Sequence, residues 1–285
     1  MIGSGLVALC FTWLMTSESH AMNTAFTFST STDETLEGNA VGEDEVWQVN
    51  SSLTAGNRIS GPVFAPSFVD SNEDIDALAI FSGSFYFSVS SSATINDGAG
   101  TLAVESDDII QFNPQAAAGS QFSIFFDPDN LWDALENTDA FSFHSTGDLL
   151  LSTSTQAVST IASLTAEDTD IVRVDPGNLA GASIFLDGGS TFVAGDAEDI
   201  DGFSYVSDTE MYLSTSASAR LPGMGADFSS GDLVLWDGTN GSIAVPEAAF
   251  GATDSMNLDA ISIPEPSRAL FLLLGATSIL LRRRR

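Results

Sequence analysis

The chain has 285 residues, and its 39 acidic residues outnumber its 8 arginines, so its formal net charge at pH 7 is −31. Hydrophobic residues make up 44% of it, enough to fill a core, which excludes disorder of the whole chain. The central segment, residues 22–263, holds 37 acids against 3 arginines. Such a surface repels phosphate backbones, which excludes nucleic acid as its partner.

The N-terminus has the pattern of a secretory signal. An apolar stretch from Leu6 to Met15 is followed by Ser19-His20-Ala21, a small-x-small sequence. The pattern predicts a signal peptide, residues 1–21, that passes the Sec translocon and is cut by signal peptidase after Ala21. A buried N-terminal helix or strand is the alternative. Cleavage would remove the single cysteine, Cys10, so the mature chain would have no disulfide, no cysteine-bound metal and no cysteine nucleophile.

The central segment, residues 22–263, is built from an internal repeat. One motif begins at Glu45, Asp108, Asp170 and Asp232, at spacings of 63, 62 and 62 residues. Two further motifs recur with nearly the same period. They are FTFSTS at 26, FYFSVS at 85, LLLSTS at 149 and MYLSTS at 211, and IDALAI at 75, TDAFSF at 138, IDGFSY at 200 and LDAISI at 258. Each motif is rich in β-branched or aromatic residues and is bounded by turn formers, so each predicts a strand.

A fourth strand is expected at GPVFA, SIFFD, SIFLD and SIAVP, which begin at 61, 123, 183 and 242. Pro62 and Pro246 fall in it, and proline suits an edge strand. The IDALAI-type strand keeps a small residue at one position, so we place it innermost; these residues are Ala77, Ala140, Gly202 and Ala260. The pattern predicts an all-β fold, a four-bladed β-propeller of four antiparallel strands per blade, with a repeat of about 62 residues. The chain begins at the second strand of a unit and ends on the first, so we expect these two strands to pair and close the ring. A β-sandwich or an open β-repeat array is the alternative.

The C-terminus has three parts, residues 264–285. Pro264, Glu265 and Pro266 are followed by an apolar run over residues 269–281 and then by Arg282, Arg283, Arg284 and Arg285. At 1.5 Å per residue the run spans about 20 Å, less than the roughly 30 Å of a bilayer core, so it predicts a marginal transmembrane helix. The arginines would retain its end in the cytoplasm.

This tail resembles the PEP-CTERM sorting signal of exported bacterial proteins. The resemblance covers only residues 264–285. It implies recognition by exosortase, a membrane enzyme that cuts near the motif, so the protein would be transiently membrane-anchored and then reach the cell surface or the extracellular space. The family is associated with exopolysaccharide, which implies a biofilm or matrix role and an extracellular polysaccharide as partner. An ordinary tail anchor is the alternative, and it leaves Pro-Glu-Pro unexplained.

Few residues suit catalysis or metal binding. His144 is the only histidine after signal cleavage and is expected in a loop, so neither a zinc site of the usual kinds nor a Ser-His-Asp site is expected. Carboxylates recur in every unit in two series, and we expect them to cap turns. A more specific hypothesis is that they form an acidic ring near one mouth of the central channel of the propeller and bind Ca²⁺ there. The two series are Asp76, Asp139, Asp201 and Asp259, and Glu45, Asp108, Asp170 and Asp232.

The repeated Ser and Thr residues, as in STST, are expected on a solvated strand face. Because a catalytic pair breaks symmetry, whereas these acids repeat, no catalytic residue is assigned. The sequence therefore predicts an exported, non-catalytic binding or structural β-propeller without an assigned cofactor. A secreted polysaccharide hydrolase is the alternative; it would need two or three Asp or Glu residues in the loops of one blade without equivalents elsewhere.

Overall fold

The computed structural model describes residues 26–49, 59–69, 73–134, 136–193, 199–252 and 255–263. The predicted signal peptide with Ala21, the Pro264-Glu265-Pro266 motif, the apolar run and the terminal arginines lie outside the described residues. Among the helices that the structure describes, none has the length and apolar character needed to cross a bilayer.

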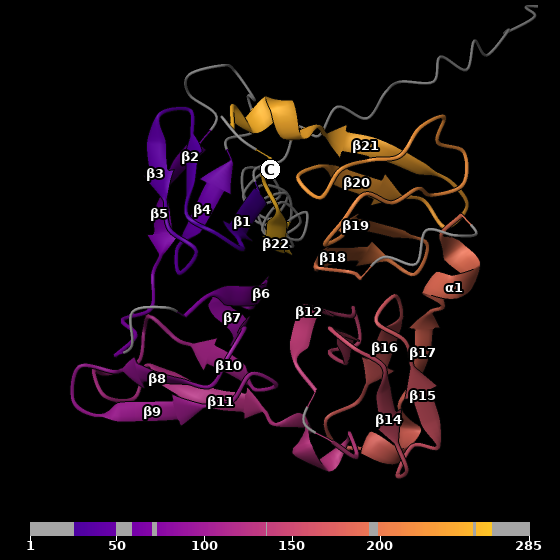
Figure 1. The fold of residues 1–285 in the computed structure, drawn as a ribbon. Coiled ribbons are helices and arrows are strands. Elements are labelled where there is room, and N and C mark those ends of the chain that lie inside the picture. The colour runs from indigo at the N-terminus through magenta and orange to yellow at the C-terminus, as the bar shows by residue number, and fades with distance from the viewer. Residues whose placement is uncertain are drawn as a thin grey trace, which may run out of the picture.

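Four antiparallel four-stranded sheets surround a central axis, which confirms the predicted four-bladed β-propeller (Figure 1). Blade 1 has the strand order β22-β1-β4-β5, blade 2 β6-β7-β10-β11, blade 3 β12-β13-β16-β17 and blade 4 β18-β19-β20-β21. The innermost strands are β6 (Ile75–Phe81), β12 (Thr138–Phe143), β18 (Gly202–Ser207) and β22 (Leu258–Ser262). The second strands are β1 (Phe26–Thr30), β7 (Ser84–Val89), β13 (Leu149–Thr153) and β19 (Glu210–Ser214). The third strands are β4 (Val46–Val49), β10 (Ile109–Phe112), β16 (Ile171–Val174) and β20 (Leu233–Trp236). The outer strands are β5 (Ile59–Phe64), β11 (Phe122–Phe126), β17 (Ser183–Leu186) and β21 (Gly241–Val245).

The ring is closed by the last described strand. β22 pairs antiparallel with β1, with Thr27 opposite Ser262 and Phe28 opposite Ile261. The hydroxyl of Thr27 donates to the carbonyl oxygen of Ser262 at 3.1 Å. The expected pairing of the two ends is therefore confirmed.

Crowding at the axis explains the small residue of the innermost strands. A Cβ atom on Gly202 would lie 2.8 Å from the hydroxyl oxygen of Ser214 and 2.9 Å from the carbonyl oxygen of Asp259. Such distances leave no room for a side chain. The placement of the IDALAI-type strand at the centre and of the fourth strand at the outside is confirmed. Pro62 lies within β5, but Pro246 lies just after β21, at the start of η3, so its expected place in the strand is wrong.

The hydrophobic core consists of four clusters, and each lies between neighbouring blades. Phe81 of blade 2 stacks on Phe143 of blade 3 with ring centroids 4.5 Å apart. Between blades 1 and 2, Phe64 stacks on Phe85 at 5.1 Å. The seam between blades 4 and 1 is packed by Phe250, which contacts Phe28 at 5.6 Å from the 3-10 helix η3 (Glu247–Phe250). Burial of apolar area thus joins the blades to one another.

The serines of the second strands are buried. The prediction that they lie on a solvated strand face is therefore wrong. Ser88 and Ser214 are completely buried, and each hydroxyl donates to a backbone carbonyl of the next blade, that of Thr138 and that of Leu258, both at 2.8 Å. The physical reason is that both faces of a propeller blade pack against neighbouring blades, so strand alternation here does not separate core from water.

Small hairpins connect the second and third strands of blades 1 to 3, and the sequence analysis missed them. They are β2 (Glu34–Leu36) with β3 (Asn39–Val41), β8 (Ala93–Asn96) with β9 (Thr101–Val104), and β14 (Ala157–Ser159) with β15 (Leu164–Ala166). In blade 4 a single bridge joins Ala219 and Phe228 in the equivalent connection. A four-residue helix, α1 (Gly188–Thr191), and two 3-10 helices, η1 (Pro128–Asn130) and η2 (Leu179–Gly181), complete the described elements.

Near the C-terminal ends of the innermost strands, serine hydroxyls join the blades. The backbone N–H groups of Ile80, Tyr205 and Ile263 donate to a serine of the preceding blade at 2.9, 3.1 and 3.0 Å. The acceptors are Ser262, Ser142 and Ser204 respectively. The seam between blades 2 and 3 differs, because Ala79 stands where the other blades have this serine and offers no hydroxyl to the equivalent N–H, that of Phe143.

Ala79→Ser should therefore stabilise the protein by about 1 kcal/mol, because the new hydroxyl can accept from the N–H of Phe143 as its three equivalents do. Ser204→Ala should cost about the same amount by removing the acceptor of Ile263. Urea unfolding measures both changes. Equal destabilisation by both substitutions would contradict the four-fold equivalence of this serine position.

Candidate functional site at the centre of the ring

The two repeated carboxylate series occupy different places. Asp108, Asp170 and Asp232 accept from the backbone N–H three residues earlier, at 2.9, 3.0 and 2.8 Å, and Glu45 does the same at 3.2 Å. These four side chains cap turns at the start of the third strands, as expected.

The other series does not cap turns, and that expectation is wrong. Asp76, Asp139, Asp201 and Asp259, here called the ring aspartates, are buried at the N-terminal ends of the four innermost strands. The four innermost strands converge on the axis of the ring and contact one another (Figure 1). The ring aspartates are close enough for electrostatic repulsion between blades: Asp76 and Asp201 both act on Asp139 and on Asp259. The structure thus forms a central carboxylate ring.

A second set of polar residues completes this ring. Two positions before each ring aspartate lie Asp74, Asn137, Asp199 and Asn257, here called the flanking residues. Each flanking residue contacts the ring aspartate of the preceding blade, in two alternating ways. Asn137 donates its amide to Asp76 at 2.5 Å, and Asn257 donates to Asp201 at 2.6 Å.

At the two other seams, the contacts join two acids. Asp74 lies against Asp259, and Asp199 lies against Asp139, close enough for a hydrogen bond between the two carboxyl groups. Since a carboxylate is only an acceptor, one member of each pair must carry a proton for this bond to form. The flanking residues thus alternate around the ring: amide–acid contacts join blades 2 and 3 and blades 4 and 1, and acid–acid contacts join blades 1 and 2 and blades 3 and 4. Asp259 also contacts Asp201 across the seam between blades 4 and 1.

The carboxyl groups of the ring are hard to ionise. Burial is the largest cause, and the neighbouring carboxylates add to it. Together they raise the pKa of Asp74, Asp139, Asp199 and Asp259 well above the ordinary value. Burial also raises the pKa of Asp76 to about 7, as it does that of Asp199, and the pKa of Asp201 to about 6, while the amide hydrogen bonds that Asp76 and Asp201 accept lower these values in part.

Buried polar atoms without a partner are concentrated in this ring. Among the described residues, seven buried side-chain N or O atoms lack a hydrogen-bond partner, and six of them belong to the ring. All six are oxygens. They are Asp74 Oδ1, Asp139 Oδ2, Asp199 Oδ1, Asp259 Oδ2, Asn137 Oδ1 and Asn257 Oδ1. Such atoms normally have a partner, so this ring is the candidate functional site.

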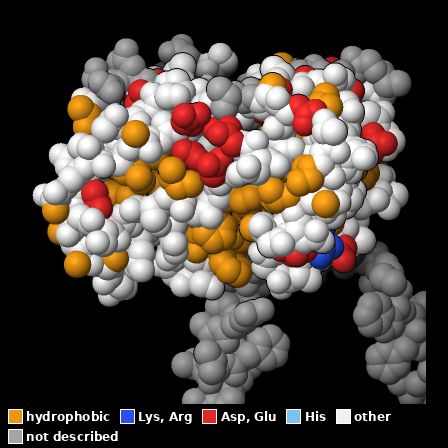
Figure 2. Space-filling model, turned by 90° about the horizontal axis from the view of Figure 1, so that it is seen from below, with side chains coloured by type: hydrophobic (Ala, Val, Ile, Leu, Met, Phe, Trp, Pro, Cys, Tyr) orange, Lys and Arg blue, Asp and Glu red, His pale blue; other side chains and the backbone are white. Residues whose placement is uncertain are grey.

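Among the residues that the structure describes, three carboxylate triads have one oxygen per residue within 4.8 Å of one another. Two are in the ring: Asp74, Asp76 and Asp259, and Asp139, Asp199 and Asp201. The third, called the rim triad, is Glu105, Asp107 and Asp129, in which only Asp107 is buried. It lines a hollow of about 430 Å³ beside β9 and β11. Figure 2 shows the molecule from below the view of Figure 1, and acidic side chains gather on the surface that is visible there.

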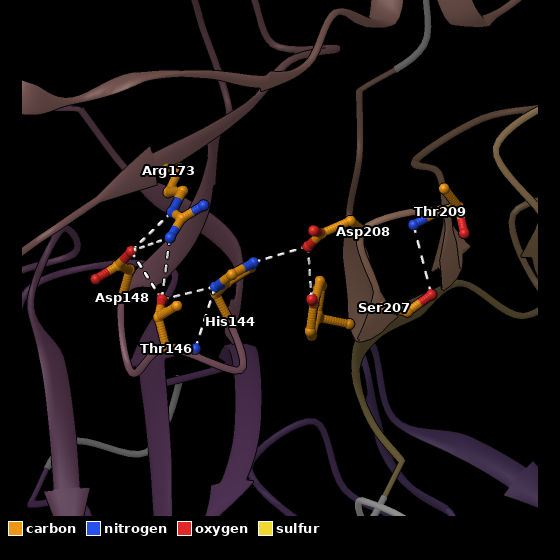
Figure 3. Close-up of polar contacts among 8 residues, drawn as sticks. His144, Thr146, Asp148, Arg173, Ser207, Asp208 and Thr209 are labelled. Carbon is orange, nitrogen blue, oxygen red and sulfur yellow. Dashed lines mark hydrogen bonds and ion pairs between the residues drawn. The ribbon is translucent and has the colours of Figure 1, made fainter.

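His144 has a structural role that the sequence did not reveal. It lies in the loop after β12, as expected, but it is 3% exposed. Its Nε2 atom is 2.8 Å from Asp208 of blade 4, and its Nδ1 atom is 2.7 Å from the hydroxyl oxygen of Thr146 (Figure 3). Thr146 is itself bonded to Asp148 and Arg173, so both ring nitrogens of His144 take part in a polar bridge between blades 3 and 4.

The flanking residues were missed by the sequence analysis, although a signal was present. They sit at one fixed position of the repeat and alternate Asp, Asn, Asp, Asn. The ring aspartates were noted, but only the fold shows that both sets meet at one place.

No family model matches the chain, and no curated protein matches it. Solved structures do. A Bacteroides caccae protein of unknown function matches with a TM-score of 0.40 and 9% identity over 85% of this chain and 100% of that one. Virginiamycin B lyase from Staphylococcus aureus matches with a TM-score of 0.32 and 9% identity over 75% of this chain and 81% of the lyase. At such identity these matches assign neither a ligand nor an activity.

In buffer with a chelator, the protein should lose stability as the pH rises from about 4 to about 8. The folded ring keeps protons that the unfolded chain has released, so its raised carboxyl pKa values stabilise the fold at low pH, and this contribution falls through the folded pKa. Each extra proton corresponds to about 1.4 kcal/mol per pH unit. The negative charge of Glu43 raises the pKa of Asp74 further, and that of Asp168 raises the pKa of Asp199 further.

Urea unfolding at several pH values measures this slope. Asp74→Asn combined with Asp199→Asn should flatten it, because both acid–acid pairs become amide–acid pairs like those at the other two seams. An unchanged slope in this double variant would show that the pH dependence originates outside the ring.

Proposed function

We propose that this protein is an exported, non-catalytic β-propeller that acts as a binding or structural module at the cell surface or in the extracellular matrix. The observation that supports it best is the symmetry of the central site. Every blade contributes one ring aspartate and one flanking residue, so the ring joins the blades and has no unique pair of acids such as hydrolysis needs. Export and exosortase processing are supported only by the two terminal sequences, and a biofilm role by the resemblance of the tail.

The terminal signals have a direct test in the native bacterium. We expect the exported protein to begin at Met22 and to have lost residues beyond the Pro264-Glu265-Pro266 motif. Replacing Pro264, Glu265 and Pro266 by alanine should leave the apolar run attached and keep the protein in the membrane fraction. Intact-mass measurement and cell fractionation give both results. Release of the triple-alanine variant with the same mass as the wild type would contradict processing at this motif.

One observation favours the alternative of a secreted polysaccharide hydrolase. The rim triad belongs to one blade. The positions equivalent to Asp107 are Thr169 and Gly231 in blades 3 and 4, and blade 1 has Asp44 there. Burial raises the pKa of Asp107 to about 6, as suits a general acid, and the adjacent hollow is open to solvent. The rim is therefore the place where this activity would be found.

We expect no turnover when the exported protein is incubated with a panel of acidic and neutral polysaccharides, because the proposed role is non-catalytic. Reducing-end release measures the outcome. Turnover that Asp107→Asn abolishes by at least 100-fold, while Asp237→Asn on another blade leaves it unchanged, would establish the hydrolase instead.

A further inference from the structure

We propose that the central carboxylate ring binds two calcium ions, one in each of its two triads, and that these ions hold neighbouring blades together. The first triad combines Asp74 and Asp76 of blade 2 with Asp259 of blade 1. The second combines Asp139 of blade 3 with Asp199 and Asp201 of blade 4. Each ion would thus lie at a seam where two acids meet without an asparagine.

The ligand atoms are available and buried. Asp139 is 5% exposed and Asp259 is 3% exposed, and each has an Oδ2 atom without a hydrogen-bond partner. Asp74 and Asp199 each add one further unpartnered oxygen. An ion bound to these oxygens would provide the partner that they lack and replace the proton that the acid–acid bond requires.

The donor set selects the class of ion. Every unpartnered atom of the ring is an oxygen, which excludes ions that prefer nitrogen or sulfur. The oxygens of each triad lie within 4.8 Å of one another. A calcium ion between two such oxygens would be at a Ca–O distance of about 2.3–2.6 Å from each, which is its usual bond length. Mg²⁺ needs shorter bonds in a near-ideal octahedron and keeps several of its waters, so a largely buried site built from three carboxylates suits it less.

The two other seams provide an internal comparison. There the flanking position is asparagine, whose amide donates to the ring aspartate with no proton or ion required. The chain thus already contains the substitution that should remove each calcium site. Asp74→Asn and Asp199→Asn place at seams 1–2 and 3–4 the residue that Asn137 and Asn257 provide at the other two.

The experiment uses the full chain in mild detergent, stripped with EDTA and titrated with CaCl₂ by isothermal calorimetry at pH 7.5. We expect two high-affinity equivalents of calcium per chain. Thermal unfolding followed by circular dichroism should show a rise in melting temperature of about 10 °C at saturating calcium. Asp74→Asn and Asp199→Asn should each lose one equivalent, and the double variant should lose both and its calcium-dependent rise.

The matched control is Glu105→Gln combined with Asp129→Asn, which removes two exposed acids from the rim triad and should keep both equivalents. In EDTA the central double variant should melt no lower than the wild type, which shows that it still folds. The proposal is overturned if calcium does not raise the wild-type melting temperature, or if the central double variant still binds two ions. Loss of the ions in the rim variant alone, loss of both ions in Asp74→Asn alone, or an equal effect of MgCl₂ would also overturn it.

Discussion

The pairing of β22 with β1 is the interaction on which the architecture depends. It joins residues more than 230 positions apart and turns a linear series of similar sheets into a closed ring. Closure requires four innermost strands to approach one axis, and this requirement accounts for the alanines and the glycine at their crowded positions. It also brings the first side chains of these strands together whatever their charge. The chemistry of the centre is therefore a consequence of ring closure.

That centre carries an electrostatic conflict. Ring and flanking positions together hold six aspartates and two asparagines, and burial of ionised carboxylates is unfavourable. The protein resolves the conflict in two ways at alternate seams: an amide donor at two of them, and a shared proton at the other two. The fold is four-fold repeated, but its charge pattern is two-fold. An ancestral pair of unlike units, duplicated once, would produce this alternation, and so would selection for two separate ion sites.

Much of the fold could be predicted from the sequence because three motifs share one period and because the chain starts and ends in the middle of a unit. Strand order within the blade followed from proline and from small residues, two signals with a direct steric cause. The central site could not be predicted in the same way. Asp108 and Asp139 both occur at the start of a strand in a similar local sequence, yet one caps a turn and the other lies in the ring. The distance of the strand from the axis separates them. The small residue of the innermost strands indicates that distance, but the local sequence does not show that the carboxyl groups of all four blades meet at one place.

The burial of Ser88 and Ser214 has the same origin, since a face that alternation assigns to water is covered by the next blade. What the structure adds to the sequence is thus mainly the seams between blades, where hydrophobic clusters, serine hydroxyls and carboxyl groups all meet. The seam between blades 1 and 2 matters most, because its acid–acid pair includes Asp259 on the closing strand itself. An ion that replaces the proton between Asp74 and Asp259 would attach β22 to blade 2, in addition to its pairing with β1. If the tail is removed after this strand, as proposed above, such a second attachment would keep the ring closed.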